Sequence, residues 1–187
     1  APGMHAKDVT ESGCLDSTRP GGSKVESYLH NVVRPWVSNH FPVATDRQHT
    51  GIGGMSMGGY CAVDQGLRHA KDFATILSLL PYGEPGKAGP AMKSSPAEIE
   101  AVTPLKYIAT LDDLEAYPVA TWFAVDEPEV KGQVGLDAEK MAKALRQRGQ
   151  VAEVHIAKEG GHTWAMAIAS LPAGLEFWQR QMDQAAP

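Results

Sequence analysis

The chain lacks several features that would place a protein in a familiar class. Basic residues are not in excess: the formal net charge is -5 and the sequence pI is about 5.8, which argues against nucleic-acid binding. No apolar run approaches the roughly 18 residues that span a bilayer. The chain starts with Ala1 rather than methionine and shows no charged and then apolar leader, so we expect a processed or excised piece.

Cysteine is scarce as well. Cys14 and Cys61 are the only two, so they form one disulfide or remain two free thiols. The remaining composition is ordinary, with 43% hydrophobic and 21% charged residues in a chain of 187. This length and composition predict a single domain, residues 1–187, that buries a real core. Polar residues, with glycine and proline at 20–22, predict a loop over residues 1–23.

Short apolar runs alternate with amphipathic stretches along the rest of the chain. We predict strands at 49–53, 73–80, 119–125 and 151–157, and helices at 57–69, 137–148 and 165–182. A helix from Ser23 or Ser27 to about His40 precedes them, with a kink or a break at Pro35. Residues 81–96 are expected to form a long exposed loop. The alternation predicts an α/β fold with a parallel sheet and helices on both faces.

The most informative motif is Gly54-Met55-Ser56-Met57-Gly58, which follows the first predicted strand and opens a predicted helix. The pattern G-x-S-x-G is the signature of a nucleophile elbow, a sharp turn that lifts a serine hydroxyl clear of the sheet. A serine hydroxyl is a poor nucleophile until the backbone and a nearby base activate it. The motif therefore predicts a nucleophilic serine at position 56.

Ser56, Asp126 and His162 follow the first, third and fourth predicted strands. Residues beyond the carboxyl ends of parallel strands share one edge of the sheet, so we expect the three side chains to meet. Serine, acid and histidine in this chain order are typical of α/β-hydrolases. In such a triad the histidine takes the serine proton, and the carboxylate fixes the histidine tautomer.

The identity of the acid depends on where the third strand ends. Asp126 directly follows that strand, and Glu127 and Glu129 flank Pro128 just after it. Any of the three acids reaches the histidine for some strand boundary. We favour Asp126, with Glu127 as the alternative, and we interpret Asp137 as the N-cap of the next helix.

No cofactor and no metal site are expected. A dinucleotide fingerprint needs a third glycine where Ser56 stands, and a phosphate-binding P-loop needs Gly-Lys-Ser/Thr where Gly58-Gly59-Tyr60 stands. The remaining histidines show no pair with the spacing and local pattern of a metal site. We interpret them as surface or structural residues; they are His5, His30, His40, His49, His69 and His155.

Two longer stretches resemble the putative esterase family, which includes esterase D-like enzymes and the antigen 85 mycolyltransferases. They are Gly53-Gly54-Met55-Ser56-Met57-Gly58-Gly59-Tyr60-Cys61-Ala62, followed by Leu67-Arg68-His69, and Gly160-Gly161-His162-Thr163-Trp164. The resemblance runs from about residue 28 to the C-terminus. It implies an α/β-hydrolase fold, a serine nucleophile, no cofactor, and an extracellular or cell-envelope location. It also favours a disulfide between Cys14 and Cys61.

The chain departs from this family in two places. The acid loop lacks the usual glycine two or three residues before the carboxylate. The strands that family members carry upstream of the elbow are also absent, so we expect the chain to be the C-terminal part of a longer hydrolase. The backbone N–H of Met57 supplies one oxyanion donor, while the second normally comes from an early loop that this chain does not contain.

From these residues we predict a serine esterase or acyltransferase that cleaves a small-molecule or lipid ester through an acyl-enzyme on Ser56. The alternative is a non-catalytic hydrolase-fold module that binds a partner, which the missing oxyanion loop favours. Removal of upstream strands would also expose an apolar sheet edge. We expect either a missing N-terminal segment or a second copy of the chain to cover that edge.

Overall fold

The computed structural model describes residues 11–158 and 160–185, so most of the first half of the predicted loop 1–23 lies outside the described residues. Four parallel strands form one sheet in chain order. They are β1 (Gly51–Met55), β2 (Thr75–Leu79), β3 (Ala120–Asp126) and β4 (Val151–Ala157). The predicted α/β architecture is confirmed, and the strand at 151–157 has the predicted bounds.

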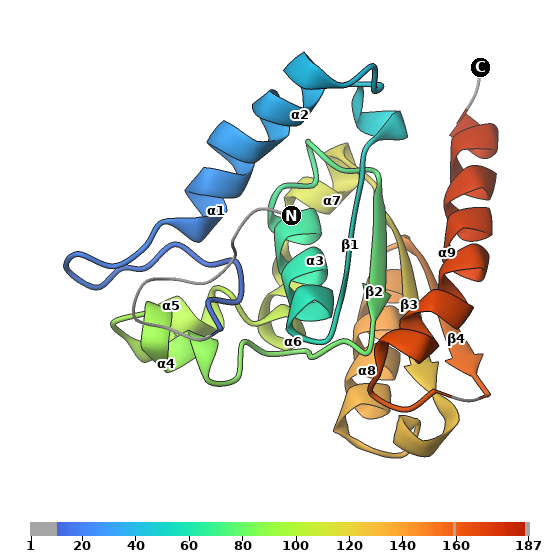
Figure 1. Ribbon diagram of the computed structural model, residues 1–187. Helices are drawn as coiled ribbons and strands as arrows, with labels where there is room; N and C mark the ends of the chain where they lie inside the picture. The colour runs from blue at the N-terminus through green and yellow to red at the C-terminus, as the bar shows by residue number, and fades with distance from the viewer. Residues whose placement is uncertain (1–10, 159, 186–187) are drawn as a thin grey trace.

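Helices cover both faces of the sheet (Figure 1). Helices α3 (Met57–Arg68) and α8 (Gln133–Gln147) pack on one face, whereas α9 (Trp164–Ala185) crosses the other. Every residue of β2 and β3 is buried between these layers, because each strand has a helix on both sides. No helix in the described part of the chain is long and apolar enough to cross a membrane.

Strand β1 starts two residues later than the sequence predicts. The Asp46 carboxylate accepts a hydrogen bond from the His49 backbone N–H at 3.1 Å, which holds residues Arg47–His49 in a short 3-10 turn, η2. The strand then runs to Met55 and delivers the chain directly into Ser56. Within residues 11–158 and 160–185, β1 pairs only with β2, so its other side is an open edge of the sheet.

The segment between β2 and β3 contains α4 (Ala88–Met92), α5 (Pro96–Glu100), α6 (Pro104–Tyr107), η3 (Ile108–Thr110) and α7 (Asp113–Ala116). The sequence predicts a helical or irregular segment over 96–114, but residues 81–96 are more ordered than the predicted long loop. Met92 of α4 is buried against Leu15, Val25 and Val102 in a small second core. The expectation of an exposed loop at 81–96 is therefore wrong, because this segment has its own apolar anchor.

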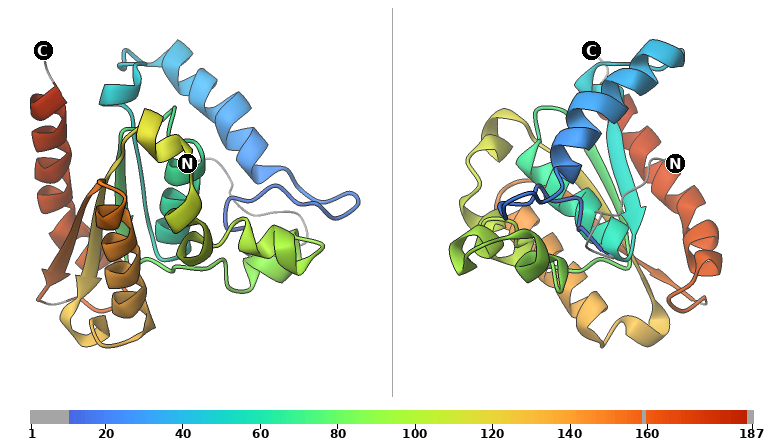
Figure 2. Two further views of the ribbon diagram at one scale, coloured as in Figure 1. Left: turned by 180° about the vertical axis from the view of Figure 1, so that it is seen from behind. Right: turned by 60° about the vertical axis from the view of Figure 1, so that its left-hand side comes forward.

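The segment before β1 projects away from the sheet (Figure 2). It consists of α1 (Val25–Tyr28), a π-helical turn η1 (Leu29–Val33) and α2 (Arg34–His40). Pro35 lies in the first turn of α2, which continues η1 without a break, and it cannot donate the N–H that a regular helix needs there. The irregularity predicted at Pro35 thus takes the form of a π-helical turn just before it.

Helix α8 begins four residues earlier than predicted, and Asp137 is not its N-cap. The Asp137 side chain is buried inside the helix, where it accepts hydrogen bonds from the Gly83 N–H at 3.0 Å and the Gln133 amide at 2.6 Å. A buried carboxylate needs such partners. Asp137 therefore ties α8 to the chain that leaves β2.

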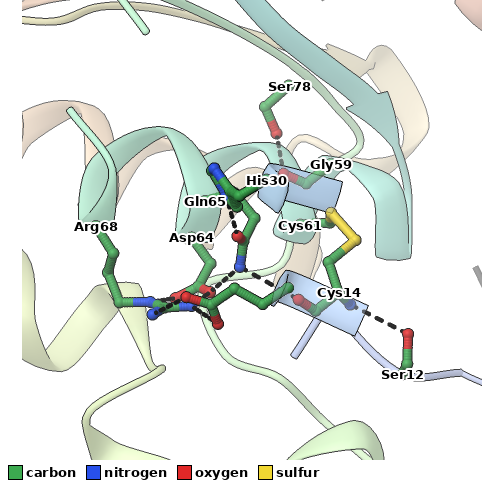
Figure 3. The surroundings of a disulfide bond; sticks show 10 residues. Ser12, Cys14, His30, Gly59, Cys61, Asp64, Gln65, Arg68 and Ser78 are labelled. Atoms are coloured by element: carbon green, nitrogen blue, oxygen red, sulfur yellow. Dashed lines mark hydrogen bonds and ion pairs between the residues drawn. A yellow bond between two sulfur atoms is a disulfide. The ribbon is translucent and has the colours of Figure 1, made fainter. Parts of the chain in front are cut away.

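Cys14 and Cys61 form a disulfide, with their Cα atoms 5.6 Å apart (Figure 3). Cys61 lies in α3, and Cys14 lies in the loop that precedes α1, 47 positions away. Both half-cystines are buried. The bond fastens the N-terminal loop to the helix that starts at Ser56.

We predict that the Cys14→Ser/Cys61→Ser double variant loses about 2–4 kcal/mol of unfolding free energy, because the crosslink restricts the unfolded chain. Urea denaturation followed by circular dichroism measures this change. Dithiothreitol should destabilise the wild type by a similar amount and leave the double variant unaffected. Equal stability of oxidised wild type and double variant would contradict a stabilising disulfide.

Candidate active site

Ser56 has the backbone conformation of a strained turn, with φ 60° and ψ -121°. Non-glycine residues adopt positive φ rarely, and such strain persists only where neighbouring structure enforces it. Two hydrogen bonds do so here. The Ser56 N–H donates to the Leu79 carbonyl at 2.9 Å, and the Ser56 carbonyl accepts from the Tyr60 N–H at 3.0 Å.

Glycine at position 59 allows the elbow to sit against the sheet. A Cβ atom at Gly59 would lie 2.6 Å from the Leu79 carbonyl oxygen, closer than packed atoms tolerate. The Ser78 hydroxyl also donates to the Gly59 carbonyl at 2.9 Å. The start of α3 therefore contacts the end of β2 with no room for a side chain, and this contact positions Ser56.

His162 faces Ser56 from the loop after β4. Its Nε2 lies 2.7 Å from the Ser56 Oγ, which is hydrogen-bonding distance. Gly160 and Gly161 precede it with φ values of 128° and 57°, so both adopt conformations that favour glycine. The Thr163 hydroxyl donates to the Gly160 carbonyl at 2.5 Å and holds the loop just before α9. The sequence thus identified the two residues that the structure brings together.

The carboxylate beside His162 belongs to Glu129. Its Oε1 lies 3.5 Å from His162 Nδ1, and both side chains are about one-third exposed. A carboxylate at this position favours the tautomer with the proton on Nδ1. Nε2 is then free to accept the hydrogen bond from the Ser56 hydroxyl. The three groups lie in the order that acyl transfer requires, hydroxyl, imidazole and carboxylate.

The favoured acid, Asp126, does not lie beside the imidazole. Strand β3 extends one residue further than predicted, so Asp126 is still within the sheet, paired with Ala157 and completely buried. Within the described part of the chain, neither of its carboxylate oxygens has a hydrogen-bond partner. The alternative, Glu127, is exposed to solvent.

The turn after β3 explains the difference. Residues Glu127–Glu129 form a 3-10 turn, η4, which carries the chain over the sheet edge. Glu129 thereby lies over the end of the sheet on the side of His162. The sequence does not show which acid lies beside His162, because several acids lie close together here. A one-residue shift in the strand end changes which of them reaches the histidine.

The predicted oxyanion donor is the backbone N–H of Met57. Met57 directly follows Ser56 and is the first residue of α3. The first N–H groups of a helix have no partner within the helix. The N-terminus of a helix also attracts negative charge, so this amide is a candidate donor to an oxyanion on the Ser56 side.

The chain was compared with known families and structures. A model of the family described as "Putative esterase" matches residues 15–178. The chain belongs to the putative esterase family. The match covers the whole of the described sheet, together with Ser56, Glu129 and His162.

Individual relatives match this chain over a short stretch or at low sequence identity. An acetyl esterase of Caldicellulosiruptor saccharolyticus is 38% identical over 52 residues, which is 28% of this chain and 20% of that protein. A ferulic acid esterase structure superposes with a TM-score of 0.74 and 22% identity over 92% of this chain and 67% of the other. An S-formylglutathione hydrolase structure from Agrobacterium tumefaciens superposes with a TM-score of 0.75 and 15% identity, over 91% of this chain and 63% of the other.

These structural likenesses establish the α/β-hydrolase fold that the sequence predicts. The putative esterase chain spans one-fifth of the acetyl esterase and about two-thirds of the two structures. About one-third of each superposed structure therefore consists of residues that have no counterpart in this sequence.

A pair of glycine substitutions tests the packing at the elbow. Gly59→Ala should lower the unfolding free energy by about 1–3 kcal/mol, because the added methyl group collides with the Leu79 carbonyl. Gly58→Ala is the matched control, since a Cβ there meets nothing within 4 Å and alanine favours the helix. Urea denaturation of both variants measures the difference. Equal effects of the two substitutions would contradict a tight contact between elbow and sheet.

Proposed function

We propose that the chain carries the catalytic serine, histidine and acid of an enzyme that hydrolyses carboxylic esters. The single observation that carries this proposal is the 2.7 Å contact between the Ser56 hydroxyl and the His162 imidazole at a strained elbow. Membership of the putative esterase family supports the same reaction class. No cofactor or metal is part of the proposed chemistry.

In the proposed mechanism Ser56 Oγ attacks the acyl carbon while His162 Nε2 takes its proton. Glu129 stabilises the imidazolium that forms and orients the ring through Nδ1. The Met57 N–H donates to the oxyanion. The alcohol leaves with the proton from His162, and an acyl-enzyme remains. Water then releases the acid, or an acceptor hydroxyl takes the acyl group in a transfer reaction.

Ser56→Ala should abolish labelling by a fluorophosphonate probe and lower p-nitrophenyl ester hydrolysis by at least about a thousandfold. Both are measured in the natural protein that contains this chain, with short and long acyl chains as substrates. Labelling that persists in Ser56→Ala would assign the nucleophile elsewhere. Absence of both labelling and hydrolysis in the wild type would favour the non-catalytic, partner-binding module.

The acid is tested by three isosteric variants. Glu129→Gln should lower kcat by about a thousandfold to ten-thousandfold, because the glutamine no longer stabilises the imidazolium. Glu127→Gln is the matched control in the same turn and should change kcat less than tenfold. Asp126→Asn tests the rival acid. A large loss in Asp126→Asn with normal activity in Glu129→Gln would overturn the assignment.

We further propose that polypeptide from outside residues 11–185 covers the open edge of β1 and supplies the second oxyanion donor. An apolar stripe on α9 lies next to this edge, and a cavity of about 510 Å³ is lined by both elements. Its members include Trp164, Ile168, Leu171 and Leu175, at helical spacing. Trp164 and Ile168 are 74% and 72% exposed, which is unusual for large apolar side chains on a monomer.

The isolated chain should therefore self-associate, and Ile168→Lys/Leu171→Lys should make it more nearly monomeric. Light scattering after size-exclusion chromatography measures the mass. Leu136→Lys is the matched control, because Leu136 is an exposed leucine on α8 that does not line this cavity. A wild-type chain that runs as a 20 kDa monomer with full esterase activity would refute the proposal.

We also propose that the protein folds in an oxidising compartment, such as the cell envelope or the extracellular space. The buried disulfide between Cys14 and Cys61 supports this location, because such bonds are rare in reducing compartments. Fractionation of the producing cells tests it.

A further inference from the structure

Two histidines and an aspartate converge at the end of α3 that is remote from Ser56. His30 comes from the π-helical turn η1, His69 directly follows α3, and Asp72 lies in the turn before β2. Each offers one donor atom, and these atoms all lie within 4.8 Å of one another. The two imidazole rings are 3.9 Å apart, centroid to centroid. π-Helical turns are rare and often occur at functional positions.

The partners of His30 define its tautomer. The Gln65 amide nitrogen donates to the Cys14 carbonyl at 3.3 Å and to the Asp64 carboxylate at 3.1 Å, so the Gln65 Oε1 is its acceptor end. His30 Nε2 lies 3.0 Å from that oxygen and therefore carries the proton (Figure 3). This leaves a lone pair on Nδ1, which lies 3.8 Å from Asp72 Oδ2.

The second imidazole has an analogous partner. His69 Nε2 lies 2.7 Å from Glu26 Oε1. With Nε2 facing this carboxylate, Nδ1 is the His69 nitrogen that remains for a metal ion. Histidines that bind metals have this kind of partner, a carboxylate or carbonyl oxygen on the second nitrogen.

A positively charged group between His30 Nδ1 and Asp72 Oδ2 would be stabilised by both atoms. A lone pair facing a carboxylate at 3.8 Å is unfavourable, and the distance is too long for a hydrogen bond. The Arg34 guanidinium forms an ion pair with the other oxygen of Asp72, Oδ1, at 2.7 Å. This ion pair neutralises part of the carboxylate charge.

We propose that His30, His69 and Asp72 bind a divalent transition-metal ion of the Zn²⁺ class. Zinc binds imidazole nitrogen at about 2.0–2.1 Å and carboxylate oxygen at about 2.0–2.2 Å. Donors on a tetrahedral ion are therefore about 3.4 Å apart, so small side-chain rotations close the site. The three donors leave one coordination position for water.

The ion would have a route to this site. His30 and Arg34 line a cavity of about 670 Å³ between the N-terminal helical segment, which is α1, η1 and α2, and the start of β1. The cluster is also only partly buried. Hydrated ions can therefore approach the cluster from the side of His30 without unfolding of the core.

The site lies far from the proposed chemistry. Ser56 and His69 flank the 12 residues of α3, so about 18 Å of helix separates them. The ion would instead join the π-helical turn to α3 and to the turn before β2. Its expected effect is on stability, with little effect on the reaction at Ser56.

Metal binding is tested on the EDTA-treated and dialysed chain. Zn²⁺ at a hundredfold excess over its Kd should raise Tm by roughly 5–10 °C. Co²⁺ should bind with one equivalent and give visible ligand-field absorption, because a site with two imidazoles and one carboxylate is not centrosymmetric. A wild-type chain with neither the Tm shift nor the Co²⁺ absorption would overturn the proposal.

Variants locate the ion. Asp72→Asn and His30→Gln should each lose the Zn²⁺-dependent Tm shift and the Co²⁺ absorption, whereas His40→Gln should keep both. His40 is the matched control because it is exposed on α2, next to the same helical segment, and outside the cluster. Shifts in Asp72→Asn and His30→Gln equal to that of the wild type would assign the ion to other residues. If one of these two variants fails to fold, the Zn²⁺-dependent Tm shift of the other still shows whether the cluster binds the ion.

Discussion

The contact between the end of β2 and the start of α3 positions the rest of the site. The Leu79 carbonyl accepts the Ser56 N–H, and the absence of a side chain at Gly59 lets the helix approach that same carbonyl. These contacts enforce a positive φ at Ser56, which an isolated chain would avoid. Once the serine is fixed, the carboxyl ends of β3 and β4 need only bring their loops to the same edge. The parallel sheet provides this without further constraint.

The sequence predicted those parts of the site that depend on local signals. Ser56 lies in a glycine-rich elbow motif and His162 follows two glycines, and both patterns have one plausible backbone solution. Glu129 was not favoured, because its position depends on the length of β3. The sheet pairing that adds Asp126 to the strand arises from contacts with β4 that composition does not reveal. A one-residue difference at a strand end was enough to change which carboxylate lies beside His162.

The same distinction holds for the rest of the fold. Strands β2 and β3 were predictable from apolar runs, since burial on both faces demands them. Strand β4 was predictable from its alternation of apolar and polar residues. Helix α4 between β2 and β3 was not, because Met92 is buried against residues from the N-terminal segment that are distant in sequence. The histidine and aspartate cluster was missed for a related reason. His30 and His69 are 39 positions apart, and only the packing of the N-terminal helical segment on α3 brings them together.

The strand order has a consequence for how the chain folds during synthesis. Each strand pairs with the one made just before it, so the sheet can grow in the order in which it leaves the ribosome. Helix α9 is the exception, because it covers the second face of β2 and β3 and is translated after all four strands of the described sheet. Until residues 164–185 emerge, the apolar side chains on that face have no cover. A chain that stalls or is truncated before α9 would therefore expose the most apolar part of its sheet to chaperones and to aggregation.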